Sequence, residues 1–212
     1  MWLDRVKNAY GDDLELIWKN FSLEQVNSKE GEDWKVWEQG EIGERRSLMS
    51  QVAAEAARKQ GPEAHQKFHL ALLTARHGGD DRIALNEEEP LIELAEKVGL
   101  DGGRLREDMK DPELKKIVGR DHEAAVAEGI FGTPTFVFEN GGSAYIKTFI
   151  PPEDDAVAEF EHFMAIASDR PYIGEIKRPQ PPWPNGCPGV APNGTHLKSP
   201  SLSLRGRLFF SP

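Results

Sequence analysis

The residue types that carry most protein chemistry are scarce in this sequence. It contains one cysteine among 212 residues, Cys187, so an intramolecular disulfide and a Cys-x-x-Cys motif are both excluded. His65 and His69 are four residues apart, a spacing that places two metal ligands on one helical face. The residues between them lack the glutamate of zinc-protease helices, and we therefore expect no metal site there.

Three further groups of chemically capable residues favour structural interpretations. His122 lies between two acidic residues and is interpreted as a solvated helical residue. The consecutive acids Glu87–Glu89 are expected to stabilise a helix N-terminus rather than to form a catalytic pair. Trp34 and Trp37 are typical of core or lid packing, and a ligand cleft between sheet and helices is the alternative.

The most informative string is GIFGTPTFVF, residues 129–138. Its proline, Pro134, stands directly before the β-patterned run Thr135–Phe138. A proline in this setting is confined to the start of a strand, and its tertiary amide makes the cis isomer accessible. An apolar-periodic helix precedes the string and an Asn-Gly turn follows it, so the sequence predicts a helix, a proline loop and a hairpin.

The apolar pattern predicts an α/β chain with a long helical block. Spacings of three and four residues, bounded by Gly or Pro, predict helices, and alternation predicts a strand at 14–18. The Asn-Gly turn joins strands at 135–138 and 144–149. A helical block between a strand and a hairpin indicates an α/β domain with a helical insertion, about residues 40–127. The predicted helices cover residues 2–10, 44–60, 63–76, 88–98, 102–109, 112–127 and 153–167.

Charge and composition exclude several partners and define a tail. The chain has 26 basic and 36 acidic residues, a formal charge of −10, which argues against a nucleic-acid partner. It has no stretch of about eighteen apolar residues and no secretory profile at its start, so we expect a cytoplasmic protein and no membrane partner. Residues 179–212 hold eight of the fifteen prolines and are predicted to be a disordered tail behind a domain at 1–178. The apolar run Leu208–Phe210 within the tail is either a small interaction motif or a non-native reading-frame end.

The unit around Pro134 resembles the C-terminal half of the DsbA-like branch of the thioredoxin superfamily. The shared pattern is a helix, Gly-x-x-Gly-Thr-Pro-Thr, an Asn-Gly hairpin and a final helix. This resemblance extends over nearly all of residues 1–184 and implies an α/β thioredoxin-like fold with a helical insertion. The other stretches that carry it are Trp18–Asn27, Phe68–Ala75 and Arg170–Pro179.

The resemblance also implies an activity and a missing part. The family performs thiol–disulfide exchange with a Cys-x-x-Cys motif at the start of the first helix, where the helix dipole lowers the pKa of the thiolate. The family pattern places these cysteines and an interior strand ahead of Met1, so we expect an N-terminally truncated chain without a catalytic residue of its own. The backbones of Leu14–Trp18 and Thr135–Phe138 would then present open strand edges. Cys187, in the tail, is no substitute.

A binding role for the proline loop follows from the same resemblance. In thioredoxin folds the residue before the cis-proline offers its backbone to an extended peptide or thiol ligand, which makes Thr133 and Pro134 the predicted substrate-binding residues. The expected partner is a small molecule or peptide that contains a thiol or disulfide. No cofactor is expected, and glutathione or another low-molecular-weight thiol is the alternative.

Three functions stay open from the sequence. The leading one is a thiol–disulfide oxidoreductase scaffold of the DsbA-like family that lacks the reacting cysteines. The second is a glutathione-dependent isomerase or transferase of the kappa-like branch. The third is a non-catalytic module that binds peptides at the cis-proline loop.

Overall fold

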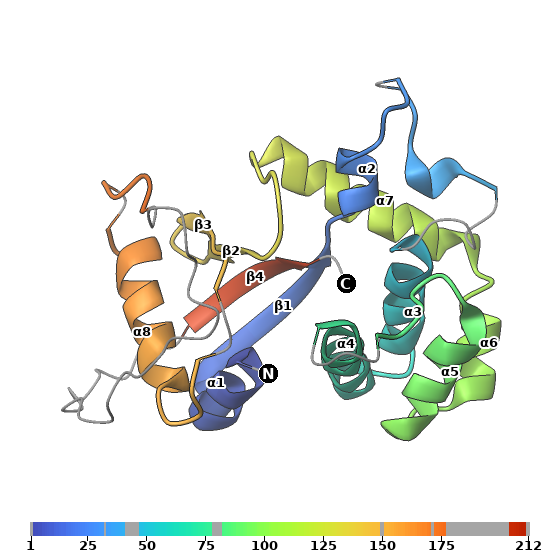
Figure 1. The fold of residues 1–212 in the computed structure, drawn as a ribbon, viewed down its shortest axis with the longest axis horizontal. Coiled ribbons are helices and arrows are strands. Elements are labelled where there is room, and N and C mark those ends of the chain that lie inside the picture. Colours follow the sequence, from blue (N-terminus) through green and yellow to red (C-terminus); the bar gives the residue numbers. More distant parts are fainter. Residues whose placement is uncertain are drawn as a thin grey trace. The chain divides into compact units, whose positions relative to one another are not determined.

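The structure is a computed structural model that describes residues 2–31, 33–40, 47–77, 82–148, 151–170 and 172–176, and the backbone of a strand at 204–210. It divides into two compact units (Figure 1): Met1–Ile17 with Phe136–Arg207, and Trp18–Thr135 with Leu208–Pro212. The helices are α1 (Trp2–Tyr10), α2 (Leu23–Val26), α3 (Leu48–Arg58), α4 (Pro62–His77), α5 (Glu88–Lys97), α6 (Gly102–Asp108), α7 (Pro112–Ala127) and α8 (Ala156–Ala167). The strands are β1 (Leu14–Asn20), β2 (Thr135–Phe138), β3 (Ser143–Tyr145) and β4 (Leu204–Phe210).

The first unit pairs the helices α1 and α8. The sequence of α1 places its apolar residues on one face, and Trp2, Leu3 and Val6 are buried there. The indole of Trp2 lies edge-on to Phe160 of α8, with ring centroids 6.1 Å apart. Its Nε1–H donates to the carbonyl of Ala156 over 2.7 Å, so the buried polar atom has a partner. These contacts join α1, near the start of the chain, to α8.

The predicted hairpin is confirmed, with a shorter second strand. Gly141 has a φ of +86°, a conformation that glycine adopts without steric cost. The side-chain oxygen of Asn140 accepts from the amide of Gly142 at 3.0 Å, and Phe138 N–H donates to the Gly142 carbonyl at 2.8 Å. The prediction placed the second strand at 144–149, whereas β3 ends at Tyr145; of the remaining residues, Phe149 lies outside the described part.

The four-stranded sheet has the order β1-β4-β2-β3, so the last segment of the chain lies inside the sheet. In Figure 1 β4 lies beside β1 and runs in the same direction. This differs from the prediction of a disordered tail through residue 212, and the strand edges predicted to be open are paired through β4. The physical reason is that buried backbone donors and acceptors need partners, and the strand-forming run Leu208–Phe210 can supply them.

The second unit contains the helical insertion, which has its own hydrophobic core. The helix α3 is buried on most of its surface, from Leu48 to Ala57, and packs against α4, α6 and α7. Fully buried residues such as Leu48, Phe68 and Leu72 fill the space between these helices. The alanines of α3 allow the neighbouring helices to approach closely. The prediction of a helical insertion with tightly joined amphipathic helices is thus confirmed.

The ends of the insertion helices follow from capping residues that the sequence provides. Asp101 caps α6 by accepting from the amide of Arg104 at 2.8 Å, and Asp111 caps α7 by accepting from Glu113 at 2.9 Å. The acids Glu87–Glu89 lie at the N-terminus of α5, as predicted. The predicted helix at 44–60 is shorter in the structure, where α3 covers Leu48–Arg58 and residues 44–46 lie outside the described part.

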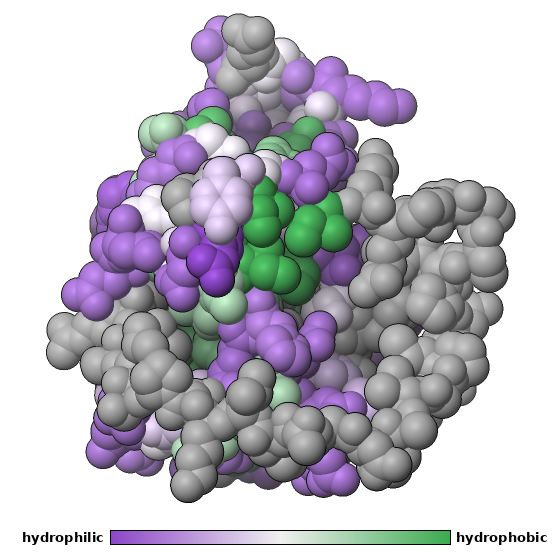
Figure 2. Space-filling view, turned by 90° about the vertical axis from the view of Figure 1, so that its left-hand side faces the viewer, coloured by the Kyte–Doolittle hydropathy of each residue, from purple (hydrophilic) through white to green (hydrophobic). Residues whose placement is uncertain are grey.

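The surface of the first unit carries a few exposed apolar side chains. Figure 2 shows one face of the molecule, where a small apolar patch is surrounded by hydrophilic residues. Exposed residues of this kind on or after α8 are Ile166, Ile173 and Ile176. Within the described residues, no helix has both the length and the apolar character that crossing a membrane requires.

Candidate functional site

The loop that contains Pro134 is positioned by the end of α7. Gly129 follows the helix with a φ of +82°, and its amide donates to the Val126 carbonyl at 2.9 Å. The amide of Ile130 donates to the Ala125 carbonyl at 3.0 Å, which completes a Schellman motif. Ile130 is buried and anchors the loop, so the chain turns toward β2 at a fixed point.

The predicted binding residues lie at the accessible part of this loop. The Thr133–Pro134 peptide bond is cis, and both residues are half-buried. The side chain of Thr135 is buried and donates to the carbonyl of Gly132 at 2.7 Å. This hydrogen bond joins the two ends of the segment that contains Thr133 and Pro134. Phe131, two residues before Thr133, has an apolar ring and is 69% exposed.

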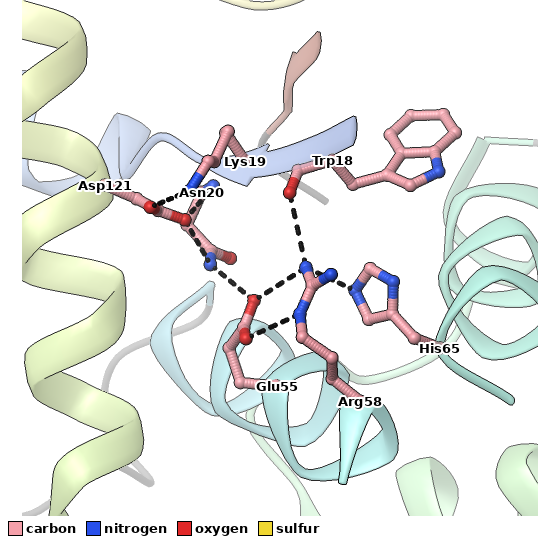
Figure 3. Close-up of polar contacts among 7 residues, drawn as sticks. All are labelled: Trp18, Lys19, Asn20, Glu55, Arg58, His65 and Asp121. Atoms are coloured by element: carbon pink, nitrogen blue, oxygen red, sulfur yellow. Dashed lines mark hydrogen bonds and ion pairs between the residues drawn. The ribbon is translucent and has the colours of Figure 1, made fainter. Parts of the chain in front are cut away.

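A cluster of polar residues lies at the end of β1, within the second unit (Figure 3). Asp121 of α7 accepts from the backbone amide of Asn20 at 3.1 Å and from its side chain at 3.2 Å. Lys19 forms an ion pair with the same carboxylate at 2.9 Å. These contacts connect the end of the strand to α7, because every one of them involves Asp121.

The other half of the polar cluster is centred on a buried carboxylate. Glu55 of α3 is 4% exposed and accepts from the side chain of Asn20 at 2.9 Å. Arg58 pairs with Glu55 through Nε at 2.9 Å and also donates to the Trp18 carbonyl at 3.2 Å. Its Nη2 lies 3.0 Å from Nε2 of His65, as Figure 3 shows. The charge of Glu55 is therefore balanced at short range.

Comparison with known proteins identifies the family. The model of the DSBA-like thioredoxin domain matches residues 2–160, which is most of the chain. This chain belongs to the DSBA-like thioredoxin domain family. No curated protein matches it. The predicted thioredoxin-like α/β fold is confirmed by this match together with the mixed sheet and helices of the structure.

The DSBA-like domain of this chain has a thiol–disulfide oxidoreductase-type scaffold, and its sequence holds no Cys-x-x-Cys motif. Cys187 lies outside the described residues, and none of the described residues is a cysteine. The described residues also contain no group of three or more His, Cys, Asp or Glu side chains that could hold a metal ion.

The histidine pair of the DSBA-like domain is buried and neutral. His65 and His69 are 3% and 6% exposed, and their rings stack with centroids 5.7 Å apart. Burial, and secondly the charge of Arg58, lowers the pKa of each histidine to about 3. The Trp18 ring packs against His69 at 4.4 Å. Neutral imidazoles of this kind stabilise the core and do not become protonated near neutral pH.

The prediction that His122 is solvated is wrong. The residue is 5% exposed, and its Nδ1 accepts from the backbone amide of Ser22 at 3.1 Å. Its ring packs between Phe21 and Trp37. Burial, and to a smaller extent the charge of Lys35, lowers its pKa to about 4. Val118, His122 and Ala125 have the spacing of one helical face and are all buried. This spacing indicates burial of His122, whereas its acidic neighbours suggested exposure.

The two tryptophans of the second unit pack as core residues. Trp37 is buried against Gly119 of α7, where a Cβ atom would lie 2.6 Å from the indole nitrogen. Trp34 is half-buried against the same core. Trp37 also lines a surface cavity of about 640 Å³. Charged residues of α7 lining this cavity are Lys115, Lys116, Arg120 and Glu123.

This cavity is separate from the proline loop. Its lining residues are Trp37–Gly40 and residues from Pro112 to Glu123 of α7, whereas the loop follows the C-terminal turn of that helix. Glu123 is the cavity residue nearest to the C-terminus of α7, and it lies four residues before the end of the helix at Ala127. Lys115 already donates to the carbonyl of Gln39 at 2.9 Å, and Lys116 pairs with Glu113. The cavity therefore adds no residue to the binding loop.

Proposed function

We propose that this chain is a DSBA-type scaffold that binds a thiol- or disulfide-containing peptide or small molecule at the loop Phe131–Pro134 and positions it for thiol–disulfide exchange. The observation that carries the proposal is the placement of Thr133 and Pro134, half-buried and directly before β2, in a chain of this family. The anchored residues on both sides, Ile130 and Thr135, support a preformed binding surface.

The ligand is held mainly through the backbone of the loop. An extended peptide adds to a strand by main-chain hydrogen bonds, which give affinity without requiring a particular sequence. Thr133 is the residue before the cis-proline, and its backbone offers such groups. The exposed ring of Phe131 supplies apolar contact to the side chain that follows the ligand sulfur. Binding of this kind accepts many peptides and selects for an extended conformation.

The exchange reaction needs sulfur atoms from outside the described residues. In one step a thiolate attacks a disulfide, a new S–S bond forms, the old S–S bond breaks, and the leaving sulfur departs as a thiolate. A low-molecular-weight thiol such as glutathione would supply the attacking sulfur when bound. The loop orients the disulfide, and the scaffold remains covalently unchanged. The predicted cytoplasmic location stays a prediction.

The absence of cysteine from the described residues favours a second candidate, a binding module without catalysis. This candidate uses the same loop and the same ligand class. It differs only in the fate of the bound disulfide, which stays intact. The two candidates are separated by turnover, because binding is expected for both.

The backbone role of Thr133 is testable with two substitutions at one position. Thr133→Pro removes the amide donor, and Thr133→Ala removes the hydroxyl and keeps the amide. The probe is carboxymethylated insulin B chain, a peptide whose blocked sulfur atoms cannot exchange. We expect Thr133→Pro to weaken binding about tenfold, equivalent to about 1.4 kcal/mol, and Thr133→Ala to change it less than about twofold. Isothermal titration calorimetry measures both, with circular dichroism to show that each variant is folded.

Equal weakening by both substitutions would contradict backbone recognition at Thr133.

A separate experiment measures turnover as insulin reduction with glutathione, for the wild-type chain and for Cys187→Ser. Turnover above background in both supports exchange with an external thiol, and the glutathione-dependent branch if glutathione alone also binds. Turnover that is lost in Cys187→Ser would place the reacting sulfur on this chain. Background turnover with intact peptide binding supports the binding module.

A further inference from the structure

We infer that the position between β1 and β2 is a strand-acceptor slot that takes the C-terminal strand of a second copy of this chain as well as its own. The starting observation is the strand order β1-β4-β2-β3, in which the last strand of the chain is hydrogen-bonded on both sides. Residues 204–207 of β4 belong to the same unit as Leu14–Ile17 of β1 and Phe136–Phe138 of β2. These parts of the slot and of its occupant are therefore placed together within one unit.

An interior strand is held by its backbone rather than by its connection. Every amide of β4 faces one neighbouring strand or the other, because strands lie on both of its sides. These bonds are the same whether the strand comes from the same chain or from another. The chain segment that leads to β4 adds one effect only. It sets the local concentration of the chain's own strand at the slot.

The connection to β4 is long enough to reach another copy. Residues 177–203 lie between the last described residue of the first unit and Leu204. Extended chain spans about 3.3 Å per residue, so this segment reaches up to about 90 Å. A long connection lowers the local concentration of its own strand to the millimolar range. Exchange between copies is then expected when the protein refolds at about that concentration.

Charge favours the same chain as the occupant over an unrelated segment. Residues 179–212 carry the cations Lys198, Arg205 and Arg207 and no acidic residue, so the rest of the chain has a charge of −13. A basic strand approaching an acidic domain is attracted at long range, and the attraction acts equally on a strand from a second copy. The occupant is thus the segment Leu204–Phe210, in cis or in trans.

The decisive experiment empties the slot in the full chain. Arg207→Pro removes a backbone donor from the interior strand, and Arg207→Thr is the matched control because it removes the charge and keeps the donor. The probe is a fluorescent synthetic peptide of residues 201–212, measured by anisotropy. We expect saturable binding to Arg207→Pro, and binding at least about tenfold weaker to the wild-type chain and to Arg207→Thr, because their slots are occupied.

A peptide that itself carries the Arg207→Pro change should not bind. Equal binding of both peptides, or equal binding to all three proteins, would overturn the inference. If Arg207→Pro does not fold alone, refolding it with the wild-type peptide should recover the far-ultraviolet circular dichroism of the folded chain, and failure to recover it overturns the inference as well.

The second copy itself is tested with wild-type protein. Tagged and untagged chains are unfolded, mixed and refolded at about 1 mM, then diluted and examined by native mass spectrometry. A mixed dimer is expected for wild type and for Arg207→Thr, and its absence is expected for Arg207→Pro. Absence of the mixed dimer in the wild-type chain would contradict exchange between copies.

Discussion

The two units of this chain are stabilised by contacts of different range. The insertion is built from consecutive helices, and its core residues come from one continuous stretch between Val36 and Val118. The first unit combines segments from the start, the middle and the end of the chain. In the sheet, β4 lies between β1 and β2. Local contacts form with a small entropy cost, whereas pairing of distant strands needs long loops to close. The insertion is therefore largely determined by local sequence, and the sheet depends on its last strand.

The largest effect expected in the insertion comes from its buried carboxylate. Glu55→Ala removes the acceptor of Arg58 and Asn20, and we expect the free energy of unfolding to fall by about 3 kcal/mol. The matched control is Glu63→Ala, an exposed glutamate in the first turn of α4, with an expected change below about 0.5 kcal/mol. Urea unfolding followed by circular dichroism measures both. Equal small effects would show that the polar cluster of Figure 3 does not stabilise the insertion.

The second effect is a loss of stability in mild acid. The folded pKa of His69 is about 3, below the unfolded value of about 6.5, so the unfolded chain binds the proton first as pH falls. Stability is fully present above about pH 6.5 and decreases toward pH 3. Between pH 7 and pH 5 a histidine of this kind lowers the free energy of unfolding by about 2 kcal/mol.

Substitution of the histidine tests this pH dependence. His69→Leu should reduce the slope of stability against pH, and the exposed residue His162 provides the control His162→Leu, which should leave the slope unchanged. The measurement is urea unfolding at pH 7, 6 and 5. An unchanged slope in His69→Leu would mean that His69 is accessible to protons in the folded insertion.

The smallest effect compares helix caps in the two units. Asp101 caps α6 through a side-chain hydrogen bond, whereas Asp155 at the start of α8 makes no such bond. Asp101→Ala is expected to cost about 1 kcal/mol, and Asp155→Ala less than about 0.5 kcal/mol. Thermal unfolding of the two variants checks the difference. Equal costs would mean that the helix ends of both units are stabilised in the same way.

The sequence predicted what depends on short-range patterns. The helices of the insertion follow from apolar spacing bounded by Gly or Pro, and the hairpin follows from Asn140 and Gly141. The proline loop was found because its residues form one continuous string. Its structure agrees with the expected cis bond, and its binding role stays a proposal.

What the sequence did not predict depends on contacts between distant residues. Asn20 meets Asp121 across about a hundred positions, and no local pattern indicates that pairing. Glu55 is an acidic residue among the apolar residues of α3, which is a weak indication of a buried polar contact. The strand β4 was missed because its surroundings are rich in proline and glycine, although Leu208–Phe210 has the composition of a strand.

Amide hydrogen exchange of residues 204–210 tests the central claim most directly, because it reports whether this segment is an interior strand. The account predicts slow exchange, comparable with that of β1 and lost in Arg207→Pro. Exchange of these amides at the rate of an unstructured peptide would contradict it, and would leave β1 and β2 without a strand between them.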